Sequence, residues 1–92
     1  MILVGITTFL KLALVTLGER LADTLRKLRQ QMGLSQREMA EKLGISQPTL
    51  ARLEGGAQNI KLEVLERICR ALCCDVGELF SGKVQPLPRR QR

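Results

Sequence analysis

Apolar residues recur every three or four positions over most of the chain, which is the period of an amphipathic helix. Helix start and stop signals bound each run: Thr16–Glu19 and Ser35–Glu38 have the spacing of capping boxes, and glycines stand at positions 33 and 44. Ser46 and Asp75 precede two further runs, where each can cap a helix. The pattern predicts a compact all-α fold of five helices, over 17–32, 36–43, 47–54, 61–73 and 76–80.

The second and third predicted helices have the spacing of two short helices that cross over a tight turn. Ala40 is small enough for the close approach of the second helix, and Gly44 stands where the first must end in a left-handed turn. Five apolar side chains are spaced to meet between the two helices: Met39, Leu43, Ile45, Leu50 and Leu53. Residues 36–54 therefore indicate a helix-turn-helix.

Both ends of the chain depart from this pattern. Residues 1–16 are almost wholly apolar with one charge, Lys11, and are slightly short for a membrane span. Four interpretations of these residues remain open: an arm that covers the core, a strand or helix that pairs two chains, an upstream extension, or a membrane anchor. Residues 81–92 contain Gly, Pro and Arg in a proportion that predicts a basic disordered tail. The folded domain is expected over 17–80.

The net charge of +6 suggests a nucleic-acid partner, but the distribution of the charge along the chain weakens that inference. Residues 83–92 contribute four positive charges and no acid, so the rest of the chain has eleven basic residues against nine acidic ones. The 92 residues suffice for one small domain and leave no room for a separate catalytic or effector domain. Charge alone therefore does not decide the function.

Residues that carry chemistry are few. The chain has no histidine, and its three cysteines fall short of the four ligands of a typical zinc site: Cys69, Cys73 and Cys74. Because a Gly-rich phosphate loop and a nucleophile with a base are also missing, we expect no metal, no cofactor and no enzyme activity. The cysteines are expected as buried or half-buried free thiols, with redox sensing or an intermolecular disulfide as the alternative. Their odd number fits a reducing cytoplasm.

Several segments in order resemble the lambda-repressor/Cro family (XRE type) of bacterial and phage helix-turn-helix regulators. They are Leu28-Arg29, Gly33–Gln36, Ala40–Ser46, Leu53–Gly55, Leu65–Ile68 and Ala71-Leu72, within about Leu21 to Phe80. The resemblance implies a lambda-repressor-like domain that binds double-stranded DNA in a sequence-specific way and regulates transcription, as a repressor. The loop with Gln58-Asn59 also resembles antitoxin-type repressors, a weaker likeness.

The resemblance implies that the helix over 47–54 enters the major groove with its N-terminal part facing the bases. The amide of Gln47 can donate to and accept from an adenine edge. Thr49 offers a hydroxyl or a methyl contact, and Arg52 can reach guanine or a phosphate. Each of the three side chains is otherwise an ordinary solvated surface residue.

Phosphate contacts are expected from Gln36, Arg37, Ser46 and Lys61. Gln36 stands at a helix N-terminus, where free N–H groups favour an anion, and the resemblance implies that its amide also orients Gln47. The resemblance further places Arg29 opposite Glu54 as a partly buried ion pair. That pair is expected to hold the helices together and not to touch DNA.

One such domain contacts half of a binding site, so specific binding implies a homodimer on a palindromic operator. The candidate pairing surfaces are residues 76–80 and the apolar N-terminus. A bound dimer would act by blocking polymerase at a promoter. The alternative is an antitoxin whose main partner is a toxin protein, with DNA binding secondary.

Overall fold

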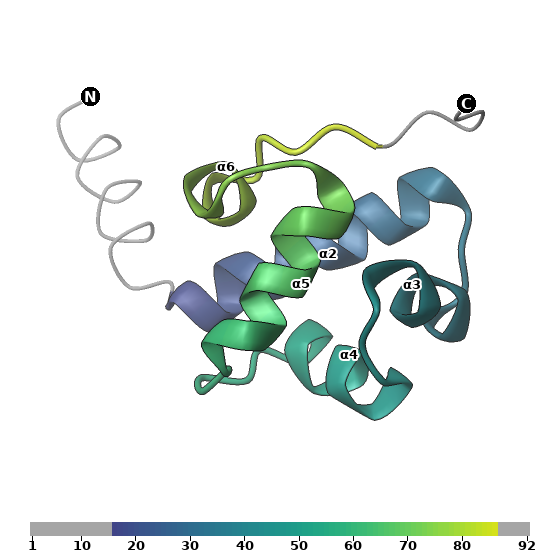
Figure 1. Ribbon diagram of the computed structural model, residues 1–92, viewed down its shortest axis with the longest axis horizontal. Helices are drawn as coiled ribbons and strands as arrows, with labels where there is room; N and C mark the ends of the chain where they lie inside the picture. Colours follow the sequence, from purple (N-terminus) through teal and green to yellow (C-terminus); the bar gives the residue numbers. More distant parts are fainter. Residues whose placement is uncertain (1–15, 87–92) are drawn as a thin grey trace, which may run out of the picture.

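The computed structural model describes residues 16–86, which form five α-helices (Figure 1). They are α2 (Leu17–Met32), α3 (Gln36–Leu43), α4 (Gln47–Glu54), α5 (Leu62–Leu72) and α6 (Val76–Ser81). The predicted all-α class is confirmed. The apolar segment before Thr16 and the arginines of the expected tail lie outside the described residues.

Side-chain caps fix where the helices begin. Thr16, Ser35 and Asp75 each accept the N–H of a glutamate three residues on, and that glutamate bonds back to the backbone N–H of its cap. Ser46 caps α4 by accepting the N–H of Thr49. The left-handed backbone at Gly33 and Gly44, with φ of 68° and 73°, ends α2 and α3, as the sequence predicts.

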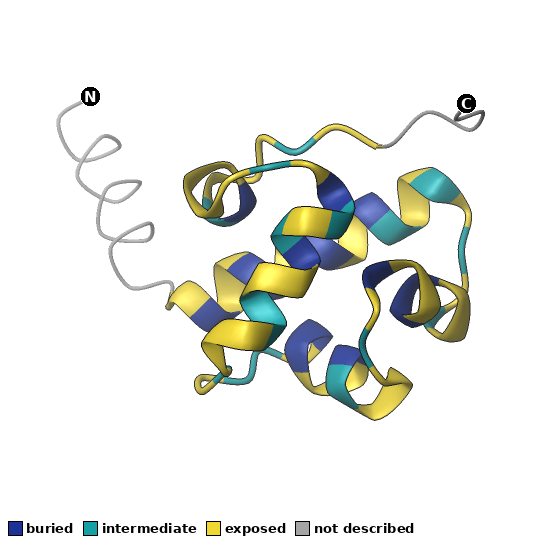
Figure 2. Cartoon of the chain, viewed as in Figure 1, coloured by how far each residue is buried: buried dark blue, intermediate teal, exposed yellow. Residues whose placement is uncertain are grey.

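The long helix α2 is at the centre of the packing: it lies against α4 and α6, while α3 contacts α4 and α5. Each helix has one side buried in the core and the other exposed (Figure 2). The core consists of Leu21, Leu25, Leu28, Met39, Ala40, Leu43, Leu50, Leu53, Ile68, Leu72 and Leu79. None of the helices within residues 16–86 is long and apolar enough to cross a membrane.

Two predicted boundaries at the C-terminal side are wrong. Helix α5 ends at Leu72, and Cys73 is an exposed residue in the left-handed conformation, not a buried helical thiol. Helix α6 includes Ser81, with Gly82 as its C-cap, and Val84 packs against the core. Contacts with the core therefore continue past Ser81, where the tail was expected to start, because the apolar side chain of Val84 after the cap still packs against the core.

Candidate nucleic-acid interface

Helices α3 and α4 meet through the apolar wedge that the sequence predicts. Met39, Ala40 and Leu43 of α3 are buried, as are Leu50 and Leu53 of α4, and Ile45 in the turn is half-buried. After the left-handed Gly44, the N–H of Ile45 donates to the carbonyl of Ala40 at 3.0 Å, which closes the end of α3. The two helices are thus held as one unit, and the side of α4 that faces away from α3 is exposed to solvent.

The outward side of α4 carries the residues expected at the bases. Gln47 and Arg52 are exposed, and their side chains make no hydrogen bond within residues 16–86. Thr49 is half-buried, and its hydroxyl lies 2.7 Å from that of Ser46. Two polar side chains on this side of the helix are therefore free for a ligand, Gln47 in its first turn and Arg52 in its last, while Thr49 is partly engaged with the cap.

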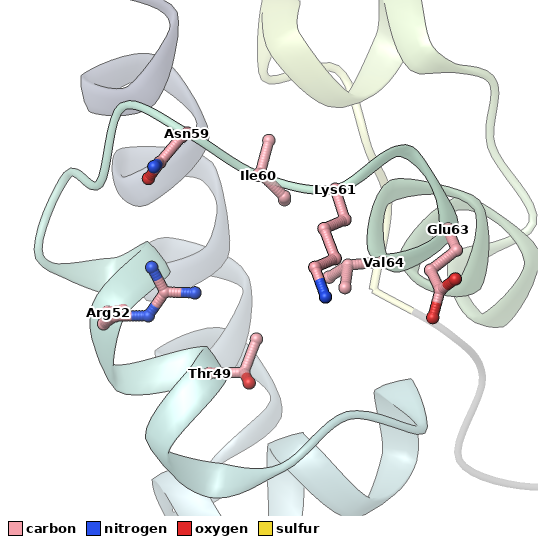
Figure 3. A pocket seen from close by; sticks show the side chains of 7 residues that line it. All are labelled: Thr49, Arg52, Asn59, Ile60, Lys61, Glu63 and Val64. Atoms are coloured by element: carbon pink, nitrogen blue, oxygen red, sulfur yellow. The ribbon is translucent and has the colours of Figure 1, made fainter.

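A hollow beside α4 adds a second set of polar groups (Figure 3). It lies between α4 and the first turn of α5 and is lined by Thr49, Arg52, Asn59, Ile60, Lys61, Glu63 and Val64. The charged ends of Arg52 and Lys61 both point toward this space. Sequence reasoning found the two cations but missed Asn59, whose only signal was a polar position in the loop before α5.

Glu54 at the C-terminal end of α4 is held by three donors. Arg29 donates from Nε at 2.8 Å and from Nη2 at 3.0 Å to the two carboxylate oxygens, and Gln36 Nε2 donates to Oε1 at 3.0 Å. The Glu54 side chain is 4% exposed and that of Arg29 21%. The hydrogen bond to Glu54 raises the pKa of the Arg29 guanidinium. We call Arg29, Gln36 and Glu54 the carboxylate cluster, which joins α2, α3 and α4.

Gln36 differs from its expected arrangement. Its amide nitrogen bonds to Glu54 and not to Gln47, because a buried carboxylate needs donors for its lone pairs. Gln36 is half-buried, while Arg37 beside it is exposed in the first turn of α3. The position of Gln36 at the start of α3 still suits a phosphate, but its side chain supports α4 from the opposite end to Gln47.

The loop after α4 is fixed to the start of α2. Gln58 Nε2 donates to the hydroxyl of Thr16 at 3.1 Å and to the carbonyl of Gly56 at 2.9 Å. Gly18 is buried so closely against this loop that a Cβ there would overlap the carbonyl oxygen of Ala57. Arg26 also donates to the carbonyl of Glu54. The C-terminal end of α4 and the loop that leads to Lys61 are therefore supported by α2.

A firmly supported short helix with a free polar side, packed across a second short helix, defines a helix-turn-helix DNA-binding domain. The chain belongs to the helix-turn-helix domain family, which matches residues 20–80. It is also similar to two crystal structures of the clp gene regulator ClgR from Corynebacterium glutamicum, each at 33% sequence identity over 72% of this chain. Their TM-scores are 0.60 and 0.59, and the matches cover 85% and 70% of those chains. No curated protein matches the chain.

Proposed function

We propose that this protein is a sequence-specific DNA-binding transcription regulator, acting as a repressor. The observation that carries the proposal is the contrast between the two ends of α4. Its N-terminal end presents exposed Gln47, while its C-terminal end is fixed through Glu54. Similarity to a solved structure named as a gene regulator supports the regulatory part of the proposal.

Base contacts are assigned to Gln47, Thr49 and Arg52, and phosphate contacts to Gln36, Arg37, Ser46 and Lys61. An amide that pairs with adenine and a guanidinium that pairs with guanine each discriminate by about 1–3 kcal/mol against the wrong base. The phosphate contacts fix the register of the domain on the duplex and carry no sequence information. Lys61 suits that role because it is exposed at the N-cap of α5, beside α4.

The active form in this proposal is a homodimer on a palindromic operator. A single helix-turn-helix module covers only a half-site, which limits its affinity and its specificity. Three large apolar side chains are exposed among the described residues and are available for pairing: Leu17, Leu62 and Val76. The antitoxin alternative stays a prediction, which co-purification of the protein with a stable partner would support.

The test compares Gln47→Ala with a matched control, Gln85→Ala, which removes the same amide from an exposed position near α6. A preferred sequence is first selected from a random DNA pool, and each protein is then titrated with that sequence and with random DNA over the same series of salt concentrations. We expect Gln47→Ala to lower the ratio of specific to random affinity by about 5- to 150-fold. The control should leave that ratio as in the wild type.

Arg37→Ala separates base contacts from phosphate contacts in the same assay. It should weaken binding to both DNAs equally and lower the slope of log affinity against log salt by about one. A Gln47→Ala ratio equal to that of the wild type would remove Gln47 from base recognition. Failure to select any preferred sequence would contradict the proposed function as a whole.

A further inference from the structure

The corner between α5 and α6 brings two cysteines together through its backbone. The N–H of Cys74 donates to the carbonyl of Cys69 at 3.0 Å, and the N–H of Cys73 donates to that of Arg70 at 3.3 Å. Cys73 itself has φ of 54°. This is the Schellman arrangement of a helix end, in which the two residues whose backbones bond across five positions, here Cys69 and Cys74, commonly have side chains in contact. An apolar pair usually fills these positions, and here both residues are thiols.

The surroundings of the pair agree with that contact. Cys69 and Cys74 are both half-buried and line one surface hollow, whose other lining residues are Glu66, Arg70, Cys73, Asp75 and Glu78. Burial, followed by the neighbouring Cys69 thiol, raises the pKa of Cys74 to about 11. The hollow opens to solvent, so a small oxidant has access to the two thiols.

We propose that Cys69 and Cys74 form a thiol pair that a hydroperoxide oxidises to an internal disulfide. The Cys69 thiol loses its proton to solvent, and its sulfur attacks one peroxide oxygen, which breaks the O–O bond and gives a sulfenic acid and water. The Cys74 sulfur then attacks the sulfenic sulfur, and the hydroxyl group leaves with the Cys74 proton as a second water. The two thiols together supply the two electrons that reduce one hydrogen peroxide.

The order of the two steps follows from the state of Cys74. With a pKa of about 11, Cys74 is protonated at neutral pH, and a thiol is a far weaker nucleophile than a thiolate. Cys74 is therefore the poorer first nucleophile, and the proposal assigns the first attack to Cys69 and the second to Cys74. Cys73 is exposed in the same hollow, with its Sγ 3.9 Å from the carbonyl oxygen of Arg70, so the test below uses a Cys73→Ser variant to isolate the Cys69–Cys74 pair from it.

The thiol pair is separate from the proposed DNA-binding surface. Helix α6 packs against α2 and α5, while α4 packs against α2 and α3 (Figure 1). The inference therefore does not depend on DNA binding, and either proposal can fail without the other. A disulfide would fix the angle between α5 and α6. Helix α6 contributes the buried side chain of Leu79 to the core.

The test treats the reduced full chain and its Cys73→Ser variant with hydrogen peroxide, blocks the remaining thiols with an alkylating agent and measures intact mass. We expect the variant to stay monomeric, to lose both free thiols and to become lighter by about 2 Da, the mass of two hydrogens. Digestion after Arg70 should yield the peptide of Cys69 linked to that of Cys74, and a dithiol reductant should reverse the change.

Two single variants, Cys69→Ser and Cys74→Ser, serve as controls and should form no internal disulfide. The Cys73→Ser result needs neither of them, so the test remains valid if a serine in the half-buried pair disturbs folding. The inference is overturned if oxidised Cys73→Ser gains oxygen atoms without linking Cys69 to Cys74. It is also overturned if the wild type forms only bonds through Cys73.

Discussion

Replacing Glu54 with alanine should destabilise the domain strongly, although its carboxylate is not among the proposed DNA contacts. The side chain is 4% exposed and accepts three hydrogen bonds within 3.0 Å, two from Arg29 and one from Gln36. Removing one partner of a buried ion pair costs about 3–5 kcal/mol, because the other charge loses its compensation. Arg29 is 21% exposed and keeps a hydrogen bond of 3.2 Å to the carbonyl of Leu34. We therefore expect Glu54→Ala to lower the free energy of unfolding by somewhat less than that, about 2–3 kcal/mol.

The assay is thermal and urea unfolding followed by circular dichroism. In a domain of this size a loss of 1 kcal/mol lowers the melting temperature by about 4–8 °C, so Glu54→Ala should lower it by about 8–24 °C. The partner variant is Arg29→Met, which keeps much of the apolar stem while removing the charge. In the double variant the two losses should not add, and the difference should be about 1–3 kcal/mol.

Two results would refute this reasoning. One is a Glu54→Ala variant that unfolds with nearly the wild-type free energy, and the other is strict additivity with Arg29→Met. Gln36→Ala is the internal reference, because it removes one neutral donor of the carboxylate cluster and should cost only about 1 kcal/mol.

Two further predictions concern the local structure around the interface. Gly18→Ala should lower stability by about 1–3 kcal/mol and shift the NMR signals of the loop after α4, because the added Cβ overlaps the carbonyl oxygen of Ala57. Gly55→Ala is the control, since its Cβ would meet ordinary contacts at 3.4 and 3.5 Å, and an equal loss there would contradict the steric argument. The backbone hydrogen bond from Ser35 lowers the pKa of Glu38, so its stabilising effect is present above the ordinary glutamate pKa and is lost as the pH falls through the lowered value. Urea unfolding across that acidic range should show a shallower decline for Glu38→Gln than for the wild type, and parallel curves would exclude Glu38 as a cause.

The helix starts and the wedge were predictable because each depends on neighbours in the sequence. Thr16 and Ser35 cap helices three residues before a glutamate, and Leu50 and Leu53 are spaced for one helix face. Such signals need no knowledge of the rest of the chain. The confirmed fold and family follow from these local patterns together with the order of the segments.

The missed features depend on contacts between residues far apart in the sequence, or on the exact residue at which a helix ends. Gln36 bonds to Glu54 because the fold brings a buried carboxylate to it, whereas the family resemblance implied a contact with Gln47. Gly18 looked like part of a capping signal, while its role is to allow the loop near Ala57 to approach α2. Cys73 continued a helical pattern in sequence, but α5 ends one residue earlier and turns it outward.

The one-sided support of α4 has a consequence for how such a protein diversifies. The hydrogen-bonded Glu54 and the buried Leu53 fix the helix at one end, whereas Gln47 at the other end makes no hydrogen bond within residues 16–86. Exchanging Gln47 for another polar residue removes no buried contact. In the proposed DNA complex, a single substitution at Gln47 would therefore change the target preference without loss of stability.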